Sequence, residues 1–386
     1  MSFKKTVNAL ENTRSATNCF SETDFAAPAF RCVQAGICPD GVKFLFYSDA
    51  NKKLFACTEN KIYYYDGSEF IFKYPVKTGT PFAFEDVADG MPRTVIISGS
   101  TEVSFSFTTF RTDTLPFTLN CGVSHCGRLF GAFGYYIRWT GKDGHSDWTE
   151  GIDKSGYLAL DPSRGRVLDL AVFSGRLVAV REYGLTVLSM YGSPENFSVD
   201  ITDTDCDRVF KNTARTVGGK LMFCTESGVK CFDGNGIKAV TTRNEIVSPT
   251  CAVEYGGKYF VACNGGIVCV DGERDCFIQT EADAMFSAGG VYFCSGGKIY
   301  KLEEGGEFHI ESGRLDFGTV RSKTVTKIEV FGKADISISN GTFTRIFPNA
   351  AGVIRPKMRG INFIVEADGD SRVDRIDVTA EVTDAV

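Results

Sequence analysis

The sequence is poor in the residues and motifs that metal sites and membrane proteins use. It has three histidines and fourteen cysteines, and no two cysteines form a C-x-x-C pair. We therefore expect no metal centre. No apolar run reaches the length of about 18 residues that a transmembrane helix needs. The N-terminal segment, MSFKKTVNALENTRSATNCF, has no apolar stretch behind its lysines. We expect neither membrane insertion nor a secretory signal peptide.

Common catalytic and phosphate-binding signatures are also missing. The sequence contains no G-x-S-x-G nucleophile motif, no phosphate loop in a strand–turn–helix setting, and no convincing amphipathic helix. The net charge is −6, and lysine and arginine are spread evenly. Without a basic stripe to neutralise phosphates, sequence-specific nucleic-acid binding is not expected. We predict a protein that is not an enzyme and uses no cofactor.

What the sequence does have is typical of an all-β protein. Apolar residues make up 43% of the 386 positions, with 41 glycines and 32 phenylalanines. Glycine supplies turn positions between short strands, and phenylalanine fills the space between packed sheets.

A strand–turn–strand pattern recurs along the chain and is the strongest structural signal. Clear copies are LFACTENKIYYYDG, LMFCTESGVKCFDG, YFVACNGGIVCVDG and VYFCSGGKIYKLEE. Together with weaker copies, the pattern starts at residues 54, 94, 129, 177, 221, 259 and 291, at separations of 32 to 48 residues. This period is typical of propeller blades. We predict a β-propeller of seven blades, with six as the alternative.

The pattern divides the chain into three parts. Residues 1–40 are irregular and predict an extended N-terminal arm, and residues 41–313 hold the propeller repeats. Residues 314–386 alternate apolar and polar positions with period two, which predicts a small antiparallel β-sandwich or sheet. A propeller closes by pairing strands from both ends of the repeats, and VKFLFYS (residues 42–48) is the expected closing strand.

Most cysteines fall inside predicted strands, where free cysteine acts as a small buried hydrophobe. We expect reduced thiols and a reducing compartment. A two-residue turn at Ser227-Gly228 would place Cys224 opposite Cys231, so a disulfide between them is the minor alternative.

Two short clusters carry candidate metal ligands, and we favour a structural interpretation for both. Cys121, His125 and Cys126 lie close together, but the adjacent pair would point to opposite faces of a strand. The D-x-D-x-D of Asp203, Asp205 and Asp207 lacks the glycine and glutamate of a calcium loop. We interpret it as a charged edge strand rather than a cation site.

The insertion Gly141–Gly156 is the best candidate for a binding loop, because long loops in compact folds are usually functional or disordered. Its candidate residues are carboxylates, a histidine and an aromatic ring: Asp143, His145, Asp147, Trp148, Glu150 and Asp153. Trp148 is suited to stacking on a sugar ring. Nothing in the sequence fixes the separation of two carboxylates, as a glycosidase requires.

Three segments resemble the propeller-bearing tail nozzle or tail tubular proteins of tailed bacteriophages and prophages. They are HCGRLFGAFGYYIRWTGKDGHSDW from residue 125, the pair Gly175–Val199 and Gly218–Gly234, and RLDFGTVRSKTVTKIEVFG from residue 314. The resemblance implies a non-enzymatic virion component whose subunits form a ring in a tail or head–tail connector. It implies other tail proteins as partners, and a location in the bacterial cytoplasm during assembly and then in the virion.

Two other functions remain open at this point. One is a propeller hydrolase or lyase that acts on glycans through the insertion's carboxylates. The other is a carbohydrate- or receptor-binding module without chemistry, for which Trp148 would be the platform.

Overall fold

The computed structural model describes residues 2–21, 26–77, 79–88, 90–106, 109–142, 147–151, 154–200, 204–272 and 274–383. Among these residues the helical elements are three single turns, η1 (Leu10–Asn12), η2 (Pro162–Arg164) and η3 (Pro194–Asn196). The described part contains no helix that is long and apolar enough to cross a bilayer. The chain divides into two compact units. One is Met1–Val33 with Gly265–Thr280 and Leu302–Val386, and the other is Gln34–Asn264 with Glu281–Lys301.

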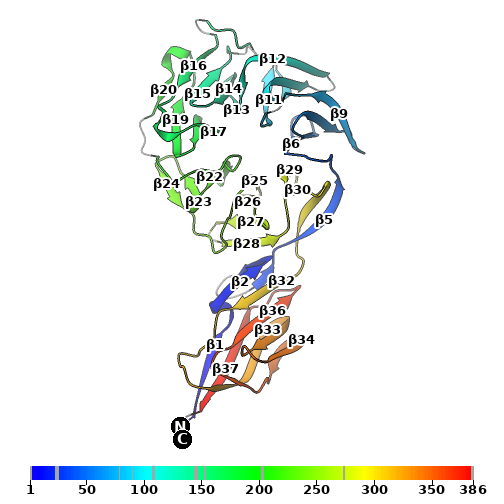
Figure 1. Cartoon of the computed structure of the whole chain (residues 1–386), viewed down its shortest axis with the longest axis vertical. Helices are drawn as coiled ribbons and strands as arrows, with labels where there is room; N and C mark the ends of the chain where they lie inside the picture. The colour runs from blue at the N-terminus through cyan, green and yellow to red at the C-terminus, as the bar shows by residue number, and fades with distance from the viewer. Residues whose placement is uncertain are drawn as a thin grey trace. The chain divides into compact units, whose positions relative to one another are not determined.

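Seven sheets form a seven-bladed β-propeller, as predicted, and are numbered here as blades 1 to 7 in chain order (Figure 1). Blade 1 contains β6 (Phe44–Ser48), β7 (Lys53–Cys57), β8 (Lys61–Tyr65) and β9 (Phe70–Pro75). Blade 2 contains β10 (Phe82–Ala88), β11 (Met91–Ser106) and β12 (Thr109–Leu119), and blade 3 contains β13 (Cys121–His125), β14 (Arg128–Phe133), β15 (Tyr136–Trp139) and β16 (Gly156–Ala159). Blade 4 contains β17 (Val167–Phe173), β18 (Arg176–Arg181), β19 (Gly184–Ser189) and β20 (Ser198–Val199).

The remaining blades follow the same plan. Blade 5 contains β21 (Arg215–Val217), β22 (Lys220–Thr225), β23 (Gly228–Phe232) and β24 (Ile237–Ala239). Blade 6 contains β25 (Cys251–Tyr255), β26 (Lys258–Cys263), β27 (Gly266–Asp271) and β28 (Arg274–Gln279). Blade 7 contains β29 (Ala284–Ser287), β30 (Val291–Ser295), β31 (Lys298–Glu304) and β5 (Phe30–Ile37). All seven predicted repeat starts, from residue 54 to residue 291, fall in the second strand of a blade. The repeated motif is therefore the hairpin of the second and third strands.

The second strands are buried on both faces, and each face packs on a different neighbour. In β18, Leu177 and Ala179 belong to a cluster with Phe130 of blade 3. Val178 and Val180, which point the other way, belong to a cluster with Phe223 of blade 5. Because side chains alternate across a strand, one apolar run of this kind serves two interfaces at once.

Ring closure differs from the prediction. Residues 44–48 form β6, which pairs with β7 in blade 1, and the strand that completes blade 7 is β5 (Phe30–Ile37). Five consecutive residues of β5, from Arg31 to Ala35, are exposed. An outer strand of this kind lacks an apolar pattern, so its sequence is indistinguishable from that of an unpaired arm.

The predicted N-terminal arm is also a set of paired strands. β1 (Ser2–Asn8) pairs antiparallel with β37 (Arg375–Thr383), and β2 (Thr13–Thr17) pairs with β32 (Phe308–Ser312). β3 (Cys19–Ser21) and β4 (Ala26–Pro28) pair with each other. The N-terminal residues are thus part of the sheet structure, because their backbone groups pair with strands far along the chain.

The C-terminal part forms one antiparallel eight-stranded sheet, ordered β1-β37-β33-β36-β32-β2. Its other strands are β33 (Lys323–Ser339), β34 (Thr344–Ile354), β35 (Met358–Gly360) and β36 (Ile364–Gly369), of which β34 and β35 pair with β33. The sheet includes β32, so it begins before residue 314, where the period-two pattern predicted its start.

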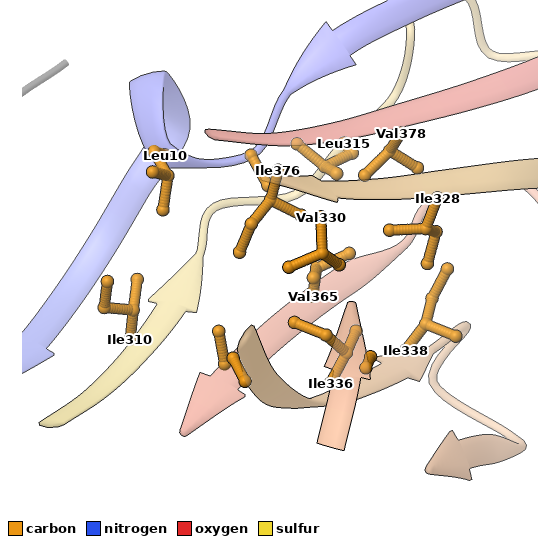
Figure 2. Packing of buried hydrophobic residues seen from close by; sticks show 14 of the residues in the cluster. Leu10, Ile310, Leu315, Ile328, Val330, Ile336, Ile338, Val365, Ile376 and Val378 are labelled. Carbon is orange, nitrogen blue, oxygen red and sulfur yellow. The ribbon is translucent and has the colours of Figure 1, made fainter. Parts of the chain in front are cut away.

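The long strand β33 lets this sheet build its own core. Its first part, which carries Ile328 and Val330, pairs with β37, and its last part, with Ile336 and Ile338, pairs with β36. Gly332 lies between them with φ of 137°. Figure 2 shows these four side chains converging with others on one apolar cluster. A bent strand shared by two parts of a sheet gives the packing of a sandwich without a second sheet.

We expect Gly332→Ala to destabilise the C-terminal sheet. A Cβ at this position would lie 2.7 Å from the carbonyl oxygen of Arg372 and 2.9 Å from the Cα of Val373, on a backbone that favours glycine. The free energy of unfolding should fall by about 2 kcal/mol or more, measured by urea denaturation. Gly352→Ala is the control: φ is 69° but the space is open, so roughly 1 kcal/mol is expected. Equal losses in the two variants would contradict the steric argument.

Candidate functional site

The structure describes three of the six candidate residues of the predicted binding loop. Asp143, His145 and Asp153 lie outside the described residues. Asp147 and Glu150 are exposed, whereas Trp148 is only 8% exposed.

Trp148 is a core residue, which contradicts the prediction of a sugar-stacking platform. Its ring packs edge-to-face on Phe117 at 5.2 Å between centroids. It belongs to an apolar cluster with Phe82 and Phe84 of blade 2 and Leu129 of blade 3. A large aromatic ring in a polar loop gains more by covering an apolar gap between blades than by facing water.

The two described carboxylates of the loop have separate partners. The Thr149 hydroxyl and backbone N–H donate to Asp147, and these hydrogen bonds lower the pKa of Asp147. Glu150 instead forms an ion pair with Arg138, with 3.6 Å between Oε1 and Nη1. Asp147 therefore stabilises the local backbone turn. Within the described part of the loop, Asp147 and Glu150 are not paired with each other as two catalytic carboxylates sharing a proton would be.

In the Cys121–His125–Cys126 cluster, the prediction that His125 and Cys126 point to opposite faces is wrong, because Cys126 Sγ lies 3.4 Å from His125 Nε2. His125 is buried at the end of β13, whereas Cys126 is exposed in the following turn with φ of 50°. Among the described residues no group of three histidine, cysteine or acidic side chains is placed to hold a metal ion. Burial of His125 disfavours its charged form and lowers its pKa below the ordinary value of 6.5.

This burial predicts a pH dependence of stability. Between the lowered pKa of folded His125 and about 6.5, the unfolded chain binds more protons, so the free energy of unfolding rises with pH. It should decrease as the pH falls below about 6.5. His125→Gln removes the titrating group. The melting temperature of the natural chain should therefore fall more between pH 7.5 and pH 5 than that of the variant, so the difference between the two melting temperatures should narrow. A gap that is constant over this range would contradict the assignment.

The D-x-D-x-D residues do not form the predicted edge strand. Asp203 lies outside the described residues, and residues 204–207 are irregular. Asp205 binds Arg164, with 2.6 Å between Oδ1 and Nε, and Asp207 accepts a hydrogen bond of 2.6 Å from the Ser227 backbone N–H. The two carboxylates have different partners, and residues 204–207 do not form a strand that would line them up on one face.

A cavity of about 750 Å³ beside blade 4 contains a buried arginine that the sequence did not single out. Arg181 is 1% exposed, and its guanidinium donates to the carbonyl oxygens of Asp161 (2.7 Å) and Gly165 (3.0 Å) and to the Thr186 hydroxyl (3.3 Å). Burial and the nearby Arg164 lower the pKa of Arg181. The arginine fastens the turn at residues 161–165 to β18 and β19.

Replacing this guanidinium should destabilise the propeller. In Arg181→Lys a single ammonium cannot reach the turn carbonyls and the hydroxyl together, so buried acceptors lose their donor. We expect the free energy of unfolding to fall by about 2–4 kcal/mol.

Arg176→Lys is the matched control in the same strand, since Arg176 is exposed and pairs with Asp200 at the surface. It should change stability by less than about 1 kcal/mol. Equal effects of the two substitutions in chemical denaturation would refute the structural role of Arg181.

All fourteen cysteines are free thiols, and most are buried. The alternative of a Cys224–Cys231 disulfide is wrong, because the strand register does not pair the two residues. Cys224 lies opposite Val229, and Cys231 lies opposite Met222. The turn consists of residues 226 and 227, because Thr225 pairs with Gly228. The two thiols thus belong to different cross-strand pairs.

The most exposed apolar side chains of the C-terminal sheet lie on the β33–β34 hairpin. Phe343 at its tip is 69% exposed, and Ile346 in β34 is 70% exposed. Ala350 is the one residue of β34 that is buried. Within the described chain β34 pairs with β33 alone, so it is an edge strand of eleven residues.

Comparison with known proteins supports the fold and goes no further. No family model matches the chain, and no curated protein matches it. The WD40 domain of Neurospora crassa Pan2 is similar, with a TM-score of 0.50 and 10% identity, over 68% of this chain and 88% of that domain.

The extracellular domain of a putative hybrid two-component system from B. thetaiotaomicron is also similar, with a TM-score of 0.50 and 10% identity over 85% of this chain. The match spans 47% of that domain, so this chain corresponds to about half of its length. At such low identity the likeness concerns the propeller architecture alone.

Proposed function

We propose that this chain is a non-enzymatic structural component of a phage or prophage tail that acts through protein–protein contacts in a homo-oligomeric ring. The proposal depends on the exposed edge strand of the β33–β34 hairpin. A long edge strand has unpaired backbone groups, and proteins that remain monomeric usually blunt such edges with charge, shortness or a cover. β34 does contain Arg345, Pro348 and two register shifts, yet it extends over eleven residues and exposes Ile346, with Phe343 exposed at the hairpin tip. A strand or apolar face of a second copy would satisfy both features.

The segments that resemble tail proteins lie on the propeller and the sheet. Gly175–Val199 covers most of blade 4, and Gly218–Gly234 covers the central hairpin of blade 5. The segment from residue 314 to 332 leads into β33, which pairs with the exposed edge strand. The resemblance thus supports the blades as a scaffold, and the hairpin supplies a contact surface.

The ring can be tested by measuring the mass of the full chain with light scattering and native mass spectrometry. We expect an oligomer that forms with rising concentration, and a monomer for the double variant Phe343→Lys, Ile346→Lys. Charges at an apolar contact lose hydration without gaining a partner. Val320→Lys is the matched control, because Val320 is 87% exposed but lies outside any strand. It should assemble like the natural chain.

A natural chain that stays monomeric at the highest soluble concentration would refute the ring. So would a double variant that assembles normally. The assignment to a phage tail has a separate test, which is the set of neighbouring reading frames. They should encode capsid, portal or tail proteins, and a neighbourhood of unrelated genes would refute that assignment.

A further inference from the structure

The seam of the propeller, where its last blade meets its first, contains a pair of cysteines in contact. Cys294 lies in β30 of blade 7, and Cys38 directly follows β5, the strand that completes that blade. Both belong to an apolar cluster that also holds Leu54 of blade 1 and Phe286 of blade 7. Residues 38–43 connect β5 to the first strand of blade 1, so the pair lies where the ring is joined.

Backbone and thiol hydrogen bonds hold the two cysteines together. The Cys38 N–H donates to the Gly297 carbonyl oxygen at 2.9 Å, and Gly297 lies in the turn between β30 and β31. The two thiols hydrogen-bond to each other, and the Gly297 N–H donates to the Cys294 sulfur. Gly297 therefore fixes both cysteines, and their sulfur atoms are neighbours in space although the residues are far apart in sequence.

This arrangement favours a thiolate at Cys294. The hydrogen bond from Cys38 lowers the pKa of Cys294, and a smaller contribution comes from the Gly297 N–H, against the opposing effect of burial. The shared hydrogen bond and burial raise the pKa of Cys38. Cys294 is therefore the nucleophile of the pair, and Cys38 is placed to resolve its oxidised form, which is the asymmetry of redox-sensing cysteine pairs.

The pair is buried at a shallow depth. Cys38 is 4% exposed and Cys294 is 2% exposed. Ile37 and Asp40, on either side of Cys38, are exposed, and so is Gly296 in the turn that follows Cys294. Exposed turns open locally at a small cost in free energy, so a molecule as small as hydrogen peroxide can reach the sulfur atoms without unfolding of the blade.

We propose that Cys38 and Cys294 form a redox clasp, in which a small peroxide converts the two thiols to a disulfide that covalently closes the ring. The Cys294 thiolate attacks one peroxide oxygen, the O–O bond breaks, and Cys294 becomes a sulfenic acid. The Cys38 sulfur then attacks the Cys294 sulfur, the S–O bond breaks, and the S–S bond forms. The thiols lose two electrons and two protons in total, and the peroxide is reduced to two molecules of water. The clasp is independent of the β33–β34 hairpin and of the tail proposal.

The disulfide should stabilise the propeller strongly, because it closes a loop that includes blades 1 to 6. A cross-link that closes a long loop removes the most conformational entropy from the unfolded chain. The melting temperature of the oxidised chain should therefore exceed that of the reduced chain by at least about 5 °C.

Cys269 and Cys276 are the matched reference pair. They lie directly opposite each other in β27 and β28, and their thiols also hydrogen-bond. Both are 0% exposed, so they should stay reduced under mild oxidation. A disulfide between them would close only a short hairpin and would add little stability.

The test uses the full chain with Cys32 and Cys126 replaced by serine, because these two exposed thiols would consume the oxidant. After treatment with hydrogen peroxide, the remaining thiols are alkylated under denaturing conditions and the peptides are mapped by mass spectrometry. We expect a linked peptide that contains Cys38 and Cys294, with Cys269 and Cys276 alkylated. The melting temperature should rise as the linked peptide accumulates, and a phosphine reductant should reverse both changes.

Substitutions then test the role of each thiol in this chain. In Cys38→Ala and in Cys294→Ala, peroxide should produce no rise in melting temperature. Each variant is compared with its own reduced form, so any loss of stability from the substitution itself cancels. A dimedone adduct should form at Cys294 in Cys38→Ala, whereas Cys38 should stay unmodified in Cys294→Ala.

The proposal is overturned if peroxide produces no link between Cys38 and Cys294, or if the link forms without a rise in melting temperature. Formation of a Cys269–Cys276 link in its place would also overturn it. So would a rise in melting temperature in Cys294→Ala equal to that of the chain with both clasp cysteines.

Discussion

The burial of both faces of the second strand in each blade is the constraint on which the propeller depends. β18, β22 and β26 are each buried at five of six positions. A sheet with two apolar faces needs a neighbour on each side, and a closed ring supplies that to every sheet. The same logic applies where the ring closes: Leu54 and Ala56 of blade 1 pack with Phe286 and Ile299 of blade 7. The closed ring of blades therefore follows from the burial of both faces of each second strand rather than from any single interaction.

The outer strands are held in place mainly by backbone hydrogen bonds rather than by side-chain burial. β5 and β20 are almost wholly exposed, so hydrophobic burial contributes little to them, and they are positioned by backbone pairing. The same is true of β34, which at eleven residues is longer than β5 or β20. Its length and the exposed Phe343 and Ile346 are why the proposed assembly is located on the C-terminal sheet.

Most buried charged groups of the polar interior have hydrogen-bond partners, and a few buried polar atoms have none among the described residues. Arg181 and Lys323 are fully buried, yet both donate to carbonyl oxygens of nearby turns. Burial lowers the pKa of Lys323, but its ammonium still has partners. Trp139 and Ser155 are less completely buried, at 8% and 5%, and their Nε1 and Oγ atoms have no partner within the described chain, as is also the case for Trp148 Nε1. A buried group whose hydrogen bonds are complete stabilises the fold.

The sequence by itself determined the all-β class, the seven hairpins and the period-two sheet at the C-terminus, because strands buried on one or both faces have an apolar pattern that can be read locally. It did not determine that β5 completes blade 7 or that β1 pairs with β37, since exposed strands have no such pattern. The buried position of Trp148 and the contact between Cys38 and Cys294 were decided by tertiary structure alone. Residues far apart in sequence meet there only after neighbouring blades have packed, and no local pattern encodes that contact.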